Sequence, residues 1–455
     1  GTDIGSTTTT VTNVAPAIGT LAATSVDENG VVHLTGSYSD VGTQDTHELT
    51  IDWGEGAPQT VAVSGGSFDI THQYLDDNPS GTPSDLYTIG VTLTDDDTGT
   101  DIGSTTTTVT NVAPAITVTS TNAPITDKAV EGEDVTLTLE FDDPGTLDVH
   151  TVTIDWDDSS GDQVMVLPVG QRTLTVDHAF QEGGIFTISV AVEDDDTGSD
   201  DAPTTAVVTG VRITEAGELQ IIGTSEADTV EVELVGDDDD DDGLRRFRDF
   251  DPNEVSGILI VLGDGNDYAK ISEGVHINSI VDGGVGADTL RGGGGDDILL
   301  GRQGEDWLYG NGGDDILIGG DGRDILFGNS DDDDDNEDYR QSASDLLTGS
   351  IFDANPTDDA DPTVDFLDDI RALSEIAKEW TSGKLLTERA DNVTGDNPQP
   401  GRLNDDSFLR LGETLFDDGD QDELVGNSWD DWLLPLGRDR VIHQFGDDDD
   451  GDDDD

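Results

Sequence analysis

Apolar and polar residues alternate along most of the first 210 residues. Examples are VTLTLEF at 135–141 and ISVAV at 188–192, and the turn-favouring residues Gly, Pro, Asn and Asp lie between such stretches. A period of two over four to eight residues is the pattern of a half-buried β-strand. The region is therefore predicted to consist of short strands that pack as sandwiches of two sheets.

A long internal repeat divides this region. The segment GTDIGSTTTTVTNVAPAI at 1–18 recurs letter for letter at 99–116, 98 residues later. The repeat lays residues 15–112 over residues 113–210 as two modules. Residues 1–14 then match the last strand of a module whose body is missing, so the chain is expected to be a fragment of a longer tandem array.

From residue 283 the period becomes nine. Five blocks follow in phase, each fitting G-x-x-G-x-D-x-L-x: GGVGADTLR (283–291), GGGGDDILL (292–300), GRQGEDWLY (301–309), GNGGDDILI (310–318) and GGDGRDILF (319–327). This period predicts a parallel β-roll in which two blocks complete one coil and the leucine of each block faces inward. Loops 18 residues apart should then stack on one edge. The predicted rows are Asp288, Asp306 and Asp324 on one edge, and Asp297 and Asp315 on the other.

The residue types in these loops suit calcium. Glycine permits tight turns that leave carbonyl groups facing inward, and calcium takes six to eight oxygen ligands, which carbonyls and carboxylates supply. Calcium ions are therefore expected between neighbouring loops of a row. The expected ligating residues are Gly283, Gly286, Asp288, Gly292, Gly295, Asp297, Gly301, Gly304, Asp306, Gly310, Gly313, Asp315, Gly319, Gly322 and Asp324, with Asp333 in the next loop.

The nonapeptides resemble the RTX, or hemolysin-type, calcium-binding repeat. Two upstream segments, IIGTSEADTVEV at 221–232 and VLGDGNDYAKI at 261–271, look like degenerate first coils with Asp228 and Asp267 at the aspartate position. The six-aspartate run at 237–242 between them has an EF-hand-like spacing. Any such run before a glycine would match that spacing, so the run is predicted to be a disordered insertion.

The two modules resemble PKD-like sandwiches of the Ig type. Both carry I-D-W, then H-x-Y/F, then Y/F-T-I-x-V before a D-D-D-x-G turn. The resemblance implies that Trp53 and Trp156 are core residues and that Tyr87 and Phe186 pack near them. In the second module W-D-D-S-S-G replaces the family's W-G-D-G-like turn.

Acidic residues gather at the ends of the predicted strands. A D-x-G-x-x-D-x-H phrase precedes each tryptophan strand, and its members are Asp40, Asp45 and His47, and Asp143, Asp148 and His150. The phrase fits either a metal site or an Asx turn with a capping histidine, and the turn is the favoured interpretation. The acidic triplets at 95–97 and 194–196 fit either a cation site or a solvated loop.

The C-terminal region changes pattern again. Apolar residues at three- and four-residue spacing predict an amphipathic helix at 362–380, and a second helix is expected near 385–393. Nonapeptide phrasing resumes at 344–349 and at 417–434. The helix-containing span is similar to the C-terminal region of large calcium-binding exoproteins of planctomycete-like bacteria and is expected to cap the open edge of the roll. The acidic tail at 436–455 is expected to be disordered.

Charge and composition narrow the function classes. With 19 Lys+Arg against 103 Asp+Glu the net charge is −84, which favours cations as partners and disfavours nucleic acid and anionic membranes. The absence of cysteine excludes disulfides, zinc thiolates and thiol catalysis. The longest apolar run, GILIVL at 257–262, is too short to span a membrane. No H-E-x-x-H or other catalytic motif occurs, so the chain is not expected to be an enzyme.

The expected fold class is all-β, with tandem Ig-like β-sandwiches followed by a parallel β-roll solenoid and a small helix-containing C-terminal cap. The expected domains are a terminal strand of a truncated preceding module at 1–14, sandwiches at 15–112 and 113–210, the roll with acidic insertions at 211–338, the helix-containing cap with degenerate RTX-like repeats at 339–435 and the acidic tail at 436–455. The expected function is that of a secreted or cell-surface structural protein whose roll is ordered by calcium after export, with the sandwiches as spacers. Other copies of the chain and cell-surface polymers are further candidate partners. The alternatives are an adhesin or carbohydrate-binding module, and a secretion or folding appendage of an enzyme encoded upstream.

Overall fold

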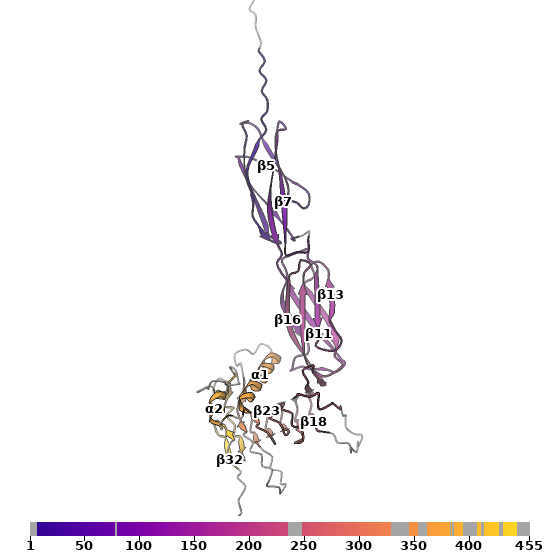
Figure 1. Ribbon diagram of the computed structural model, residues 1–455, viewed down its shortest axis with the longest axis vertical. Coiled ribbons are helices and arrows are strands. Elements are labelled where there is room, and N and C mark those ends of the chain that lie inside the picture. The colour runs from indigo at the N-terminus through magenta and orange to yellow at the C-terminus, as the bar shows by residue number, and fades with distance from the viewer. Residues whose placement is uncertain are drawn as a thin grey trace, which may run out of the picture. The chain divides into compact units, whose positions relative to one another are not determined.

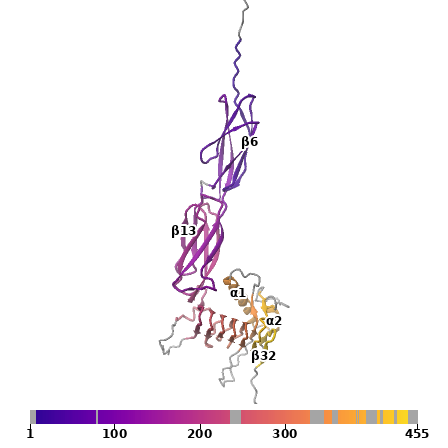
Figure 2. The same ribbon diagram turned by 180° about the vertical axis from the view of Figure 1, so that it is seen from behind.

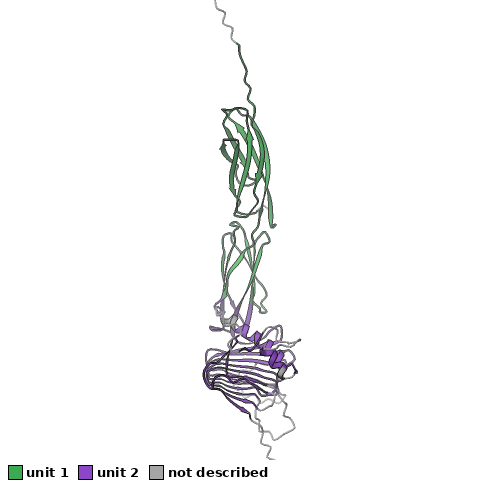
Figure 3. Ribbon diagram, turned by 90° about the vertical axis from the view of Figure 1, so that its left-hand side faces the viewer, with its two compact units in different colours: residues 1–120, 137–176, 188–204 green, residues 121–136, 177–187, 205–455 purple. Residues whose placement is uncertain are grey.

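The structure is a computed structural model and describes residues 7–77, 80–234, 248–328, 345–353, 362–382, 384, 386–394, 407–410, 414–426 and 431–443. Strands dominate and two helices occur among these residues, so the all-β fold class is confirmed. The chain divides into two compact units: unit 1 holds residues 1–120, 137–176 and 188–204, and unit 2 holds residues 121–136, 177–187 and 205–455 (Figure 3). The division passes through the second module.

The first module is a two-sheet sandwich (Figure 1). Its alternating residues place every second side chain of a strand in the core. One sheet has the order β1-β3-β6 and the other β2-β8-β7-β4-β5. The strands are β1 Ala17–Ala23, β2 Val26–Asp27, β3 Val31–Ser39, β4 His47–Asp52, β5 Gln59–Val63, β6 Ser67–Gln73, β7 Ser84–Asp95 and β8 Thr100–Thr110. Trp53 is 1% exposed and lies in one cluster with Tyr74 and Tyr87, which confirms the predicted core.

The second module repeats the same strand order. Its strands are β9 Ala115–Thr121, β10 Ala129–Val130, β11 Asp134–Asp142, β12 His150–Asp155, β13 Gln163–Leu167, β14 Thr173–Ala179, β15 Gly184–Glu193 and β16 Ser199–Ile213. Trp156 is 1% exposed, and Phe186 is buried in the same module, as predicted. The altered W-D-D turn keeps its geometry, because Asp157 has a φ of 57° and Gly54 in the first module has a φ of 85°.

Unit 2 contains the β-roll, whose parallel strands stack side by side (Figure 2). One sheet consists of β17 Glu218–Ile222, β19 Gly257–Asp264, β21 Ser279–Val285, β23 Ile298–Gln303, β25 Ile316–Asp321, β27 Leu346–Thr348 and β31 Trp432–Leu433. The other consists of β18 Thr229–Val232, β20 Tyr268–Ile271, β22 Thr289–Arg291, β24 Trp307–Tyr309, β26 Ile325–Phe327, β30 Glu423–Gly426 and β32 Arg440–His443. Leu290 pairs with Leu308 and Leu299 with Leu317, so one coil takes 18 residues as predicted.

The leucine of each block lies inside the roll. These residues are fully buried and form one apolar cluster that runs through the coils: Leu290, Leu299, Leu308, Leu317 and Leu326. The degenerate segments at 221–232 and 261–271 add residues of β17 to β20 to the same cluster. The interior is therefore a thin apolar layer to which each block contributes one leucine, which matches the sequence-based expectation.

The roll is longer than predicted, because its coils continue beyond residue 338. Strands β27, β30, β31 and β32 extend both sheets to His443. Strands β27, β30 and β31 fall within the degenerate repeats expected at 339–435, whereas β32 lies where the tail from 436 was expected to be disordered. Residues 444–455 and the six-aspartate run at 237–242 lie outside the described residues.

The two helices cover a face of the roll, which differs from the predicted cap on its open edge. Helix α1 spans Pro362–Trp380 and α2 spans Leu386–Thr394, close to the predicted ranges. Leu373, Ile376 and Trp380 of α1 pack on the outward side chains of β23 and β25, which are Ile298, Leu300, Ile316 and Ile318. A short pair of strands, β28 Ile351–Phe352 and β29 Leu415–Phe416, flanks this cluster.

The two copies of the 18-residue repeat differ in structure. In the second copy, β8 pairs with β7 along its length. In the first copy, residues 7–14 form no strand, in contrast to the expected terminal strand at 1–14, since no strand of the described chain lies beside them in the position of β7.

Candidate calcium sites

The aspartates of the nonapeptides form two continuous rows along the roll. In the first row the backbone N–H of Asp288 donates to Oδ1 of Asp306 at 2.8 Å, and that of Asp306 donates to Oδ1 of Asp324 at 2.9 Å. In the second row Asp297 donates to Oδ1 of Asp315 at 2.8 Å. The predicted rows are therefore present, and each of these acceptor aspartates holds the preceding coil in register through its Oδ1 atom.

The other oxygen of most row aspartates faces the loop interior without a partner. The buried Oδ2 atoms that receive no hydrogen bond include those of Asp288, Asp306, Asp315 and Asp324. Asp297 differs, because its Oδ2 accepts the N–H of Gly293 at 2.6 Å. A buried carboxylate oxygen without a donor is costly, so these atoms indicate a cation site.

The first glycine of each block lies directly against this unpartnered oxygen. A Cβ on Gly283 would lie 2.6 Å from Oδ2 of Asp288, and a Cβ on Gly301 would lie 2.5 Å from Oδ2 of Asp306. The same Cβ atoms would also crowd the carbonyl oxygen of the first glycine one coil further on. Carboxylate and carbonyl oxygens therefore converge here, in the space that a side chain would fill. Gly292, Gly310 and Gly319 occupy the same place in their blocks.

The glycine at the fourth position of a block has a positive φ in four of the five blocks. Gly304 has a φ of 149°, and a Cβ on it would overlap the carbonyl oxygen of Gly286. An L-residue rarely adopts this conformation, and the coils could not approach as closely with any side chain present. Gly286, Gly313 and Gly322 have positive φ values as well, whereas Gly295 does not.

Burial and neighbouring carboxylates raise the pKa values of the row aspartates. The pKa of Asp306 is raised to about 7 and that of Asp288 to about 6, with burial as the largest cause in each case. The pKa of Asp324 is raised to about 7 for the same reason. Ionisation of these carboxyl groups is therefore less favourable than that of an exposed aspartate, and a cation that compensates the charge would favour it.

The next loop of the second row contains Asp345, in contrast to the prediction of Asp333. The N–H of Asp315 donates to Oδ1 of Asp345 at 3.1 Å, and Gly328 lies against Oδ2 of Asp345 as a first glycine does. Residues 329–344, which include Asp333 and lie outside the described residues, are therefore an insertion between the glycine and the aspartate of one block.

A second and longer insertion separates Gly349 from Asp422. Gly349 lies against the carboxylate of Asp422, which accepts the N–H of Asp324 at 2.9 Å. Asp431 continues the second row after Asp345. Sequence reasoning omitted Asp345, Asp422 and Asp431 from the ligating residues, although the D-x-L phrase that each begins is the part of the block that survives.

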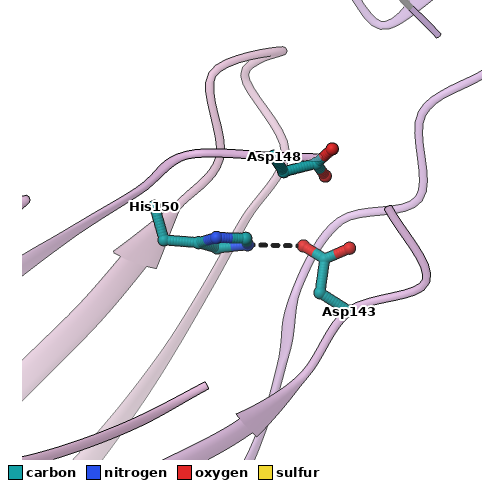
Figure 4. A group of neighbouring side chains, drawn as sticks. All are labelled: Asp143, Asp148 and His150. Carbon is teal, nitrogen blue, oxygen red and sulfur yellow. Dashed lines mark hydrogen bonds and ion pairs between the residues drawn. The ribbon is translucent and has the colours of Figure 1, made fainter. Parts of the chain in front are cut away.

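The acidic phrases of the sandwiches form Asx turns with a bonded histidine. Oδ1 of Asp143 accepts the N–H of Gly145 at 2.8 Å, and Oδ2 of Asp143 contacts Nε2 of His150 at 2.6 Å (Figure 4). Asp40 and His47 make the same contacts in the first module. The turn interpretation therefore accounts for these pairs, whereas Asp148 makes no bond to either neighbour drawn beside it.

The arrangement in the roll is suited to cations, and its backbone-to-Oδ1 hydrogen bonds hold the coils in register. Its oxygen-only ligands suit calcium, which prefers carboxylate and carbonyl oxygens, over zinc, which prefers nitrogen and sulfur. Neither described helix is long and apolar enough to cross a bilayer.

Comparison with known proteins agrees with this geometry. Residues 278–308 and 300–334 match the family model for the RTX calcium-binding nonapeptide repeat (4 copies). No curated protein sequence matches the chain.

Several solved structures resemble parts of the chain at low identity. The fibronectin(III)-like modules of Clostridium thermocellum CbhA are 15% identical, with 42% of this chain and 93% of that chain covered and a TM-score of 0.18. The Yersinia pseudotuberculosis adhesin InvE is 13% identical over 42% and 60% of the two chains, with a TM-score of 0.24. A 1.5-MDa bacterial ice-binding adhesin is 16% identical over 46% and 73%, with a TM-score of 0.19. From the family match and the roll geometry together, residues 278–334 are RTX calcium-binding nonapeptide repeats.

Proposed function

We propose that this chain is a secreted or cell-surface structural protein whose roll is ordered by calcium after export. The observation that carries the proposal is the set of buried Oδ2 atoms, each without a donor and each set against a glycine. Without cations these stacked carboxylates repel one another, and the leucine ladder inside is thin. Calcium therefore acts as a folding ligand, and the chain performs no catalysis.

The difference in calcium concentration across the cell envelope would switch the roll from unfolded inside the cell to folded outside it. Extracellular calcium modules typically bind with dissociation constants of about 10⁻⁴ to 10⁻³ M, which matches the calcium available outside the cell. Inside the cell the roll would stay largely unfolded, because binding free energy is part of its folding free energy. An unfolded roll suits export of the chain before folding.

The two sandwiches serve as spacers, in this proposal, and belong to the PKD-like type. Their tryptophan-centred cores need no ion to bury apolar surface. An adhesin or carbohydrate-binding module that uses the sandwich faces would need an exposed aromatic platform, and Trp53 and Trp156 are each only 1% exposed. The remaining alternative is a secretion or folding appendage of an enzyme encoded upstream.

A calcium titration of the whole chain tests the proposal. Far-ultraviolet circular dichroism should show a gain of β-structure as calcium is added, and equilibrium dialysis should show several ions bound per chain. Magnesium is the control, because it demands a smaller octahedral site and should not replace calcium at equal concentration. An unchanged spectrum between chelator and calcium would refute calcium-dependent folding of the roll.

A further inference from the structure

A second acidic cluster lies where the first sandwich meets the second, within unit 1. Carboxylate oxygens of Glu28, Asp76 and Asp148 lie within 4.8 Å of one another. Glu28 and Asp76 come from the first sandwich, whereas Asp148 precedes β12 of the second. These residues are 3%, 4% and 0% exposed, so the cluster is closed to solvent. Asp76 also belongs to a neighbouring group with Asp77 and Asp196.

Several oxygens of this cluster lack a hydrogen-bond donor. Both carboxylate oxygens of Asp148 are buried and unpartnered, and so is Oε2 of Glu28. The other oxygen of Glu28 accepts the N–H of Val112 at 2.9 Å, which fixes the side chain in place. Fully buried carboxylate oxygens without donors are rare in folded proteins, so these oxygens point to a cation as their partner.

The backbone around the cluster leaves room for an ion. A Cβ on Gly145 would overlap oxygens of both Asp148 and Glu28, so only glycine lets the loop approach the two carboxylates. The N–H of the next residue, Thr146, donates to the carbonyl of Leu75 at 3.2 Å and joins the two sandwiches directly.

Both ring nitrogens of His150, beside the cluster, already make hydrogen bonds. Nη1 of Arg172 donates to Nδ1 of His150 at 3.1 Å, so Nε2 of His150 carries the proton and donates to Asp143 at 2.6 Å. Neither ring nitrogen is free to bind a metal, as Figure 4 shows for the side facing Asp143. The remaining candidate metal ligands are all oxygen atoms, which favours calcium over zinc.

The chain itself offers an internal comparison. Glu131 follows β10 in the second module as Glu28 follows β2 in the first. Arg248 donates to both oxygens of Glu131, at 2.8 and 2.9 Å, and so supplies a positive charge from the protein. The neighbours that act electrostatically on Glu28 are carboxylates, namely Asp143, Asp76 and Asp194. The equivalent glutamate at the sandwich junction therefore lacks the compensation that Glu131 has.

The electrostatics agree with this picture. Burial, followed by the neighbouring carboxylates, raises the pKa of Asp148 to about 8. Burial raises the pKa of Glu28 to about 7, against an opposing hydrogen bond from Val112. The carboxylates thus destabilise the junction at neutral pH when no cation is present.

We propose that Glu28, Asp76 and Asp148 bind a calcium ion that ties the first sandwich to the second. The ion neutralises charges contributed by both sandwiches, so it fixes their junction at extracellular calcium concentrations and loosens it when calcium is removed. This site is independent of the roll and gives the spacer region its own response to calcium.

Hydrogen–deuterium exchange on the full chain tests the site, because it reports each region separately. Calcium at about 100 times the dissociation constant should slow exchange of amides at 26–30 and 145–149 by about 100-fold if they open only when the ion leaves. Asp148→Asn and Glu28→Gln should each remove this response. Amides at 283–327 should keep their own calcium response in both variants, which separates this proposal from that for the roll.

Asp45→Asn is the matched control, because Asp45 occupies the same place in the D-x-G-x-x-D-x-H phrase of the first module, at the other end of β3. It should leave the junction response unchanged. If Asp148→Asn loosens the core around Trp156, the calcium response of the junction amides in Glu28→Gln, a change in the other sandwich, tests the proposal by itself. A wild-type junction that ignores calcium, a variant that keeps the response, or equal protection by zinc would overturn the proposal.

Discussion

Each aspartate of the roll uses its two oxygens for different purposes. Oδ1 accepts a backbone N–H from the preceding coil, whereas Oδ2 of residues such as Asp306 and Asp324 is left for a cation. One side chain therefore sets the register and supplies a ligand. An asparagine could preserve the size of the group but not its charge, which makes the two roles separable by mutation.

Asp306→Asn should weaken calcium binding at both loops that adjoin it. Asp306 lies between Asp288 and Asp324 in its row, so the loss of one charge affects the ions on either side, and we expect an apparent affinity about tenfold lower or more. Isothermal titration calorimetry measures both the affinity and the number of ions. Asp439→Asn is the control, because Oδ2 of Asp439 already accepts the N–H of Leu436 at 2.7 Å. Equal losses in both variants would contradict the role assigned to Oδ2.

Gly304→Ala should destabilise the roll by about 2 kcal/mol or more, because the new Cβ combines an unfavourable φ with overlap of a neighbouring carbonyl. Urea unfolding in calcium, followed by circular dichroism, measures the effect. Gly274→Ala is the matched control in the same roll, since no atom lies within 4 Å of its Cβ position. A similar midpoint for the two variants would show that the stacked loops can relax.

At the scale of elements, the outward residues of the strands decide where the helices pack. Strands β23 and β25 begin with Ile-Leu-Leu and Ile-Leu-Ile, which are apolar on both faces, whereas β22 carries Thr289 and Arg291 outside Leu290. In each of these strands only the leucine in the middle of the three residues faces the interior of the roll. The flanking apolar residues therefore mark a face that another element covers, and α1 covers it.

Leu373→Ala in α1 should lower the stability of the roll by about 2–5 kcal/mol, because Leu373 is fully buried against that face. Thermal unfolding in calcium measures the loss. Arg371→Ala is the control on the same helix: its side chain is 77% exposed and pairs with Asp368 at 3.3 Å, an ion pair expected to contribute under about 1 kcal/mol. A small effect of Leu373→Ala would mean that α1 is not part of the folded roll.

The sequence predicted the regular coils well, because a strict period forces both the inward leucines and the aspartate rows. It also predicted the range of α1 from its apolar spacing. It failed where insertions fall inside a block, between Gly328 and Asp345 and between Gly349 and Asp422. Extending the nine-residue period past Asp324 therefore placed the next ligating aspartate at Asp333. Only contact between the separated halves identifies such a block, and periodicity carries no information about that contact.

The junction cluster escaped sequence analysis for a related reason. The D-x-G-x-x-D-x-H phrase was visible at Asp148, but the partner Glu28 lies in another module and follows a strand of two residues. The phrase alone fits an Asx turn, which is what Asp143 and His150 form. The ligand set exists only where the two modules meet.

At the scale of the whole molecule, charge links stability to pH. In the calcium-free roll the folded pKa of Asp306 and of Asp324 is about 7, above the ordinary value of 3.8. A carboxyl group whose pKa is higher in the folded state stabilises that state at pH values below the unfolded pKa. The contribution is lost as the pH rises through the folded pKa. In chelator, circular dichroism should therefore show more folded roll at about pH 5 than at about pH 8. In calcium the order should reverse, because the ions require ionised carboxylates. A chelated roll that is less folded at the lower pH would contradict the burial argument.

Calcium removal should divide the chain into a part that unfolds and a part that persists. Trp53 lies in a buried apolar cluster and Trp156 is 1% exposed in the second module, whereas the ladder of the roll is flanked by two rows of buried carboxylates. Chelation should therefore expose about 220–443 to protease and leave the sandwich cores intact, with cleavage added only near the junction of the two sandwiches if its ion is lost. Limited proteolysis with mass spectrometry of the fragments measures this pattern, and restoring calcium before the protease is added is the control. Degradation of the sandwich cores before the roll would show that calcium stabilises the modules themselves, and would contradict the assignment of the main calcium dependence to the nonapeptides.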